Sequence, residues 1–218
     1  MEIRYPNIDG IDYQAHWNDF YEFTRLVIKG KNEEFAEHIT DYADLKNLAL
    51  YWLFANAVDM TDNMRKNMSF VRLDDKDERF NRYILVPWDM DASLGRLYTS
   101  KKSYVHQIIS NPLFDRLNEE NPHDYLSTLY TLWQGLKAGP LSVNSIMGHL
   151  EYYYAQISEC GADRREMGKY PTFTSKVAAR NSYELDIEDE LSYIRSYTEK
   201  HIEWLDGKIE ELCRSGAE

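Results

Sequence analysis

The chain has 218 residues, of which 43% are hydrophobic and 14% aromatic, so it is long enough to bury one core and too aromatic for an intrinsically disordered segment. Its 25 basic and 37 acidic residues give a formal net charge of -12, which repels nucleic acid and anionic membrane surfaces over most of the protein. Such a protein can still bind nucleotide phosphates where divalent cations supply the positive charge.

The first part of the chain predicts three helices. Apolar and aromatic residues recur at helical spacing from Trp17 to Ile28, and Gly30 follows as a stop signal. A short helix is expected from Glu33 to Ile39, and Asp41 is the predicted N-cap of an apolar helix through LKNLALYWLFANAV. Four residues of that third helix are expected in the core: Leu45, Leu48, Trp52 and Phe54.

The hydrophobic period changes after this helix. Two short stretches rich in Val, Ile, Phe and Tyr, Met68 to Leu73 and Tyr83 to Trp88, predict paired strands. The charged segment DDKDERFN between them predicts a solvated connection. Together they indicate a β-hairpin with an enlarged loop.

Beyond Gly95 the chain is expected to be helical again. Helices are predicted in NPLFDRL, from Asp124 to Leu136, from Val143 to Ser158 and from Ile187 to the C-terminus. The stretch from Gly161 to Ser182 is the least periodic and predicts a long, partly ordered connection. The expected fold class is therefore α+β, mostly α-helical, as a single domain over residues 1–218 with one small β-hairpin.

Cysteine content and hydropathy narrow the protein class further. Cys160 and Cys213 are the only cysteines, too few for a disulfide scaffold or a four-cysteine zinc site, and a single bridge between them stays open. The chain has no run of about eighteen apolar residues, and its opening MEIRYPNIDG lacks a basic-then-apolar pattern, so neither a membrane span nor a signal peptide is expected. These features assign no compartment.

Two polar motifs flank the predicted hairpin. Asp62 and Asn67 precede it, while Asp89 and Asp91 follow its second strand. Because a hairpin holds its two ends side by side, we expect these side chains to converge. Carboxylate and amide oxygens suit Mg²⁺, Mn²⁺ or Ca²⁺, and no nearby Cys or His offers a zinc site. The predicted ligand is a hard divalent cation.

The order and spacing match a phosphoryl-transfer site. Protein kinases place a catalytic Asp five residues before a metal-binding Asn, then two short strands, then a second metal-binding Asp. In this interpretation Asp62 orients or deprotonates the attacking hydroxyl, while Asn67 and Asp89 hold Mg²⁺ against the phosphates of ATP. Asp91 is an additional metal ligand or a partner of the ligands.

A structural interpretation competes with the catalytic one. An Asp-x-x-x-x-Asn pair commonly marks turns and caps, and Asp89 and Asp91 also fit a solvated strand end. Two basic neighbours, Arg65 and Lys66, are weaker candidates for phosphate contacts, and Gly95 is a candidate for close approach of the chain to the site.

Several other features predict structure rather than function. His106, His123, His149 and His201 have no metal-ligand spacing and are expected to be surface or capping groups. At least one residue of Tyr152-Tyr153-Tyr154 is expected to face the core, since the three lie in a predicted helix. The acidic run ELDIEDELS is expected to begin a helix.

A family resemblance supports the catalytic interpretation. The segment YWLFANAVDMTDNMRKNMSFVRL, followed by RYILVPWDMDASLGRL, resembles the core block of the spore coat protein H (CotH) kinase family. The later NPLFDRL and RSYTEKHIEWLDGKI resemble its C-terminal region. The resemblance implies an atypical protein-kinase fold, here its larger lobe, with ATP and Mg²⁺ or Mn²⁺ as cofactors. It also implies phosphorylation of Ser or Thr hydroxyls on a partner protein.

By residue, the resemblance gives Asp62 the catalytic role, Asn67 and Asp89 nucleotide and metal binding, and Asp91 a further metal contact. The family's N-terminal half, with its basic nucleotide-contacting region, has no counterpart before Met1. We therefore expect little kinase activity from these residues alone. The resemblance implies a parent protein of the bacterial spore coat or cell envelope, while the residues themselves assign no compartment. A pseudokinase-like interaction module and a metal-stabilised structural domain stay open as alternatives.

Overall fold

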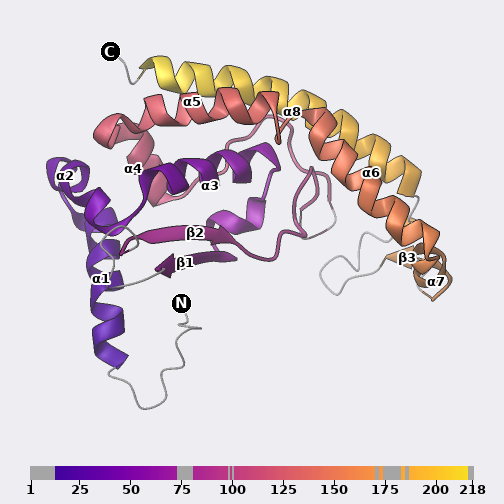
Figure 1. Ribbon diagram of the computed structural model, residues 1–218, viewed down its shortest axis with the longest axis horizontal. Coiled ribbons are helices and arrows are strands. Elements are labelled where there is room, and N and C mark those ends of the chain that lie inside the picture. The colour runs from indigo at the N-terminus through magenta and orange to yellow at the C-terminus, as the bar shows by residue number, and fades with distance from the viewer. Residues whose placement is uncertain are drawn as a thin grey trace.

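The computed structural model describes residues 13–72, 81–97, 99, 101–169, 172–173, 183–184 and 187–215. Helices form most of this part of the chain (Figure 1). The elements in chain order are α1 (Tyr13–Lys29), α2 (Asn32–Tyr42), α3 (Leu45–Ala57), the 3₁₀ turn η1 (Thr61–Met64), β1 (Met68–Arg72), β2 (Tyr83–Pro87), α4 (Pro112–Glu120), the 3₁₀ turn η2 (Pro122–Asp124), α5 (Tyr125–Ala138), α6 (Val143–Glu159), α7 (Ala162–Lys169), β3 (Thr172–Phe173), β4 (Tyr183–Glu184) and α8 (Ile187–Ser215).

The predicted N-cap of α3 was wrong. Asp41 lies inside α2, which continues to Tyr42. The cap is Asp44, whose side chain accepts a hydrogen bond from the Asn47 N–H at 2.8 Å. Aspartate is a favoured cap residue at either position. Because α2 continues beyond its predicted end at Ile39 to Tyr42, only Asp44 is left to begin the next helix. The other two helix predictions in this region are confirmed.

The hairpin forms as predicted. Strands β1 and β2 pair antiparallel, with Met68 opposite Pro87 and Arg72 opposite Tyr83. The side chain of Asn47 on α3 fastens the hairpin, because it accepts from the Leu85 N–H at 2.7 Å and donates to the Leu85 carbonyl at 3.3 Å. The predicted connection DDKDERFN lies outside the described residues except for its last, Asn81.

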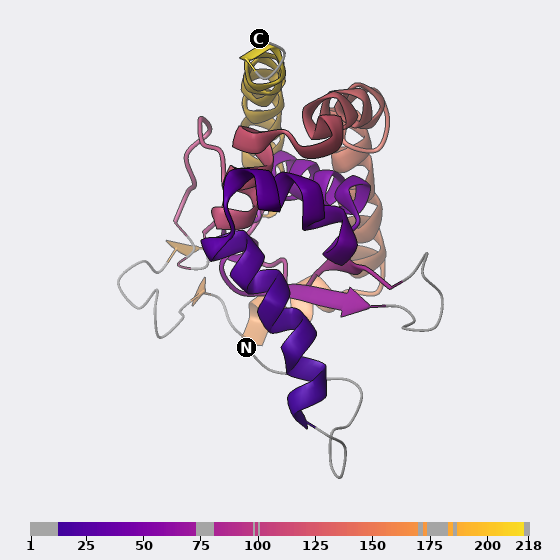
Figure 2. The ribbon, with the colours of Figure 1, turned by 90° about the vertical axis from the view of Figure 1, so that its left-hand side faces the viewer.

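An aromatic cluster joins α1 to the hairpin, which lies beside that helix in Figure 2. The rings of Phe20 and Phe70 meet edge-on with centroids 5.2 Å apart, and those of Phe20 and Tyr83 at 5.4 Å. Edge-to-face pairs of this kind each contribute about 0.5–1.5 kcal/mol beyond the apolar area they bury. The cluster fixes the face of the hairpin that also carries the buried Leu85.

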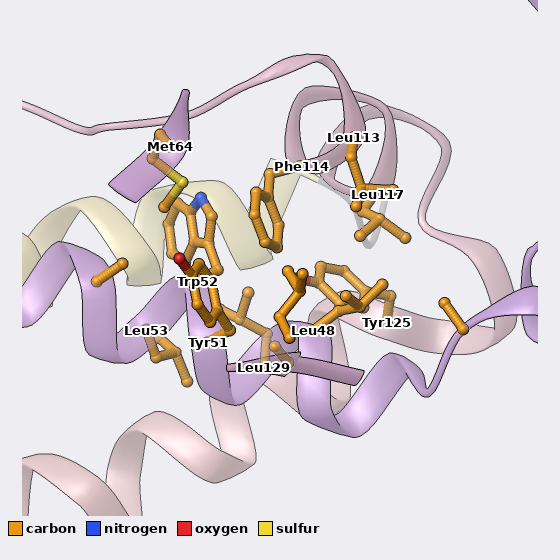
Figure 3. Close-up of a cluster of buried hydrophobic side chains, with 14 of the residues drawn as sticks. Leu48, Tyr51, Trp52, Leu53, Met64, Leu113, Phe114, Leu117, Tyr125 and Leu129 are labelled. Carbon is orange, nitrogen blue, oxygen red and sulfur yellow. The ribbon is translucent and has the colours of Figure 1, made fainter. Parts of the chain in front are cut away.

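The main core lies between α3, α4 and α5 (Figure 3). Trp52 and Leu48 of α3 are buried there together with Phe114 of α4 and Leu129 of α5. The expectation for Leu48 and Trp52 is confirmed, while Leu45 and Phe54 are partly buried against the same core. Full burial of such a side chain contributes about 1.5–3 kcal/mol, so this layer anchors the turn that follows α3.

Helix α8 is 29 residues long and runs along α5 and α6 (Figure 1). The prediction that one tyrosine of Tyr152-Tyr153-Tyr154 faces the core was wrong. Tyr152 and Tyr153 are 60% and 61% exposed, and Tyr154 is only partly buried. The buried residues of α6, Ile146 and Met147, lie near its start, because the rest of the helix extends away from the body of the molecule (Figure 1).

The expected irregular connection from Gly161 to Ser182 was partly wrong, since α7 and β3 lie within it. The acidic start of α8 is confirmed, with Glu188, Asp189 and Glu190 in its first turn. Cys160 and Cys213 are both free thiols. Among the described helices, none has both the length and the apolar character needed to span a membrane. The mostly helical α+β class with a small antiparallel sheet is confirmed.

Candidate functional site

The candidate site begins where α3 ends. The chain turns through η1, and the side chains of Met60, just before the turn, and Met64, its last residue, are buried in the core. These two anchors leave Asp62, between them, at the edge of the core with a side-chain exposure of 17%. The local sequence therefore fixes a carboxylate at the entrance to the hairpin.

The predicted catalytic Asp and its Asn partner lie together. The amide Nδ2 of Asn67 is 3.5 Å from Oδ2 of Asp62, and Nζ of Lys66 is 2.8 Å from the same oxygen. The predicted phosphate contact Lys66 therefore forms an ion pair with Asp62 in this structure. Its side chain is 63% exposed, while that of Asp62 is 17% exposed, so the pair is open to solvent on the lysine side.

The second acidic motif lies across the hairpin from Asn67. The N–H of Trp88 donates to the Asn67 carbonyl at 3.1 Å, which extends the strand pairing one step beyond Met68 and Pro87. Asp89 therefore follows immediately at the same end of the hairpin. Asp89 and Asp91 are both exposed, and within the described part of the chain neither carboxylate has a hydrogen-bond or ion-pair partner.

Two of the predicted ligands have an unusual backbone. Asn67 has φ 58° and Asp89 has φ 56°, both in the left-handed region. Asn and Asp adopt this region more readily than other non-glycine residues. Even so, such a conformation costs of the order of 1 kcal/mol and persists only where surrounding contacts enforce it.

One of those contacts is Asn63, a residue that the sequence interpretation passed over. Its side chain is buried, and Nδ2 donates to the carbonyl of Asn67 at 2.9 Å and to the carbonyl of Trp88 at 2.7 Å. The signal in the sequence was an amide immediately after Asp62 in a turn otherwise anchored by methionines. Its partners depend on the hairpin register and are not visible from residue spacing.

A second buried network holds the other side of the site. Asp59 is 1% exposed, and its carboxylate accepts from the Tyr197 hydroxyl at 2.8 Å and the Gln107 amide at 2.7 Å. Burial, followed by the charge of Asp59, raises the pKa of Tyr197, so that hydroxyl stays a donor. The sequence analysis assigned no functional role to Asp59, Tyr197 or Gln107.

The prediction for His201 as a surface or capping group was wrong. This side chain is fully buried, with Nδ1 2.5 Å from the Val105 carbonyl and Nε2 2.7 Å from the Asn56 carbonyl. It ties α8 to the end of α3 and to the segment after Gly95. A histidine on a helix face carries no sequence signal that distinguishes this position from an exposed one.

Gly95 does admit a close approach, but to α8. Its φ is +84°, and its carbonyl accepts from the Tyr193 hydroxyl at 2.6 Å. A Cβ on this residue would lie 2.6 Å from Cγ of Tyr197. The glycine therefore lets the chain leaving Asp91 pack against the helix that also binds Asp59.

The donor set suits a phosphate-bound Mg²⁺ better than a closed metal cage. Within the described residues, no three His, Cys, Asp or Glu side chains gather into a metal-holding group, so Asp62, Asp89 and Asp91 do not form a preformed three-carboxylate cluster. Mg²⁺ commonly takes one or two protein carboxylates and completes its shell with water and substrate phosphates. Asp89 with the amide oxygen of Asn67 fits that pattern.

A family model described as CotH kinase protein matches residues 3–205, which is most of the chain. No curated protein matches the chain.

Proposed function

The chain belongs to the CotH kinase protein family, and from that membership we propose that it carries the phosphoryl-transfer site of a kinase that uses ATP with Mg²⁺ or Mn²⁺. The acceptor is a Ser or Thr hydroxyl of a partner protein. The observation that carries the proposal is the 3.5 Å approach of Asn67 to Asp62 at the end of the hairpin where Asp89 emerges. The large-lobe kinase architecture is part of the same proposal.

The contacts of Asp62 suggest which of its two oxygens binds the incoming hydroxyl. Lys66 and Asn67 both approach Oδ2 of Asp62, which leaves Oδ1 to accept the hydrogen of an incoming hydroxyl. Such a contact orients the nucleophile and takes its proton while the oxygen bonds to the γ-phosphorus of ATP and the bond from that phosphorus to the leaving ADP breaks.

The proposed metal ligands are Asn67 and Asp89, and Asp91 is proposed as an additional ligand. A bound Mg²⁺ would supply positive charge against the triphosphate. Lys66 is exposed and near enough to exchange its ion pair with Asp62 for a phosphate oxygen. Positive charge matters here because the protein's net charge of -12 opposes the approach of ATP.

A non-catalytic interaction module is the second candidate, and exposed apolar residues beside the site favour it. Trp88 and Met90, on either side of Asp89, are 63% and 43% exposed. Large exposed apolar residues often mark a contact surface. In the kinase proposal the same two side chains are available to the acceptor protein.

The proposal is tested by calorimetric titration of Mg²⁺ with ATP into the wild-type chain and into Asp89→Asn. Loss of a partner of a metal ligand weakens binding about 10–100-fold, so loss of a ligand is expected to weaken it by at least that factor. Glu119→Gln, an exposed carboxylate on α4, is the control with the same charge change. Equal binding by wild type and Asp89→Asn would refute the proposed site.

Phosphoryl transfer is tested separately in the full-length natural protein, as wild type, Asp62→Asn and Glu119→Gln. We expect phosphorylation of a Ser/Thr protein substrate that Asp62→Asn abolishes and Glu119→Gln leaves unchanged. Tight nucleotide binding without phosphorylation, unchanged in Asp62→Asn, would favour the interaction module.

A further inference from the structure

The amide group of Asn63 connects the two halves of the candidate site. Its single Nδ2 donates to the Asn67 carbonyl at 2.9 Å and to the Trp88 carbonyl at 2.7 Å. Asn67 precedes the first strand of the hairpin and Trp88 follows the second. One side chain therefore fastens both chain segments at the open end of the hairpin, where the strand ladder alone would end.

Both acceptors belong to peptide units next to proposed metal ligands. The first is the carbonyl of Asn67 itself, and the second lies in the peptide bond that leads into Asp89. The Trp88 N–H also donates to the Asn67 carbonyl at 3.1 Å, so the three groups form one closed arrangement. Rotation of either peptide unit would break a hydrogen bond to Asn63 and turn the adjacent ligand.

The backbone of the two ligands needs such support. Asn67 and Asp89 have φ 58° and 56°, and left-handed residues outside glycine relax unless their surroundings hold them. Asn63 is buried, so its amide does not compete with water for these carbonyls and the bonds are retained at full strength.

Asn63 is itself held at its backbone. The hydroxyl of Tyr51 donates to the Asn63 carbonyl at 2.9 Å. Tyr51 is 4% exposed, its ring is parallel to that of Phe114 with centroids 6.1 Å apart, and burial raises its pKa to about 12. Its hydroxyl therefore stays a donor, and the core of Figure 3 fixes the turn from which Asn63 projects.

The residue type is specific at this position. A carboxamide nitrogen carries two N–H groups and can donate to two carbonyls at once. Asp has the same size, but its carboxylate only accepts, and Leu has a similar shape with no polar atom. Neither can replace the two bonds that Asn63 makes.

We propose that Asn63 is a positioning residue, which holds Asn67 and Asp89 in the geometry that binds the metal and nucleotide without touching either. This inference rests on the proposed function. A merely structural role for Asn63 predicts something different: its loss would lower stability, but the protein that remains folded would bind metal and nucleotide normally.

The test measures Mn²⁺ binding in the presence of ATP, by electron paramagnetic resonance of the free ion, for the wild-type chain, Asn63→Leu and Asn63→Ala. Loss of groups that orient metal ligands weakens metal binding about 10–100-fold, and we expect an effect in that range at a temperature where circular dichroism shows each variant folded. The Ala variant gives the result if Leu prevents folding.

Trp133→Phe is the control, because it removes the hydrogen bond from Trp133 to Asp206 of α8 and leaves the contacts of Asn63 with Asn67, Trp88 and Tyr51 in place. We expect it to lower stability and to change Mn²⁺ affinity less than about threefold, below the range for lost orienting groups. Mn²⁺ affinity of the Asn63 variants within that same threefold range would overturn the positioning role while the proposed function stands. Absence of binding by wild type, or equal binding by Asp89→Asn, would overturn both.

Discussion

Substitution of Gly95 tests whether the chain leaving the site is locked against α8. In Gly95→Ala the new methyl carbon would lie 2.6 Å from Cγ and 2.7 Å from Cδ2 of Tyr197, and 2.9 Å from the Tyr193 hydroxyl. The Tyr197 ring cannot turn away without breaking its 2.8 Å hydrogen bond to Asp59. The backbone cannot relax cheaply either, because φ is +84°.

The expected loss has two parts. An L-residue in the left-handed region costs about 1–2 kcal/mol, and inserting a carbon into a packed interior costs about 1–3 kcal/mol. Gly95→Ala is therefore expected to lower the free energy of unfolding by about 2–5 kcal/mol. That is a large fraction of the stability of a domain, which is typically about 5–15 kcal/mol.

Urea denaturation followed by circular dichroism measures this loss, with Gly207→Ala as the control. Gly207 lies in α8 itself, and a Cβ there would have no atom within 4 Å, so its replacement by Ala is expected to stabilise the helix by roughly 0.5–1 kcal/mol. A loss below about 1 kcal/mol in Gly95→Ala, with Gly207→Ala stabilised, would show that this contact is looser than the structure indicates.

Two further perturbations probe buried polar groups. Tyr197→Phe removes the hydroxyl that donates to Asp59 and leaves a buried carboxylate oxygen unpaired, so we expect a loss of about 1–3 kcal/mol in urea denaturation; a change below about 0.5 kcal/mol would contradict this role. Burial opposes the charge of Asp206, but hydrogen bonds from Lys137 and Trp133 outweigh it and hold the pKa of Asp206 below its usual 3.8. The ionised carboxylate therefore stabilises the fold fully above its unfolded pKa of 3.8, and this stabilisation is lost as pH falls through the lower folded pKa. The difference in free energy of unfolding between wild type and Asp206→Asn is expected to stay constant from about pH 5 to 8 and to narrow below pH 3.8.

The sequence predicted well where one local pattern dominated. The change from helical spacing to stretches rich in Val, Ile, Phe and Tyr located both strands of the hairpin. The expectation that the polar residues at the hairpin ends converge is met for Asp62 and Asn67, whose side chains are 3.5 Å apart. The predicted N-cap of α3 was wrong because Asp41 and Asp44 are both residues of the type that caps a helix. Only the length of α2 separates them, and that length depends on packing of its last turn.

The buried polar residues could not be predicted because their partners are distant in the chain. Tyr197 meets Asp59 across 138 residues, and His201 meets Asn56 across 145. Each such residue looks like an ordinary member of a helix until the tertiary fold supplies an acceptor. Asn63 is an intermediate case: its acceptors are 4 and 25 residues away, and the hairpin register alone brings them together beside the turn.

The backbone around the site argues that its geometry exists before any ligand binds. Among the described residues between positions 59 and 94, four that are not glycine have positive φ: Asp59, Asn67, Asp89 and Leu94. Each is held by a specific contact. Tyr197 and Gln107 hold Asp59, Asn63 holds the peptide units of Asn67 and Asp89, and the Leu94 N–H donates to the Val58 carbonyl at 2.7 Å.

These contacts come from two directions, the core beneath α3 and the long helix α8, so the loop that bears Asp89 and Asp91 is fastened at both its ends. Strained conformations of this kind persist only when the surrounding structure over-determines them, and they concentrate at functional sites. Because the ordering cost is met in folding, binding to the site requires little further loss of backbone entropy. Such a held conformation would be unnecessary at a solvated strand end, which is the structural interpretation of Asp89 and Asp91.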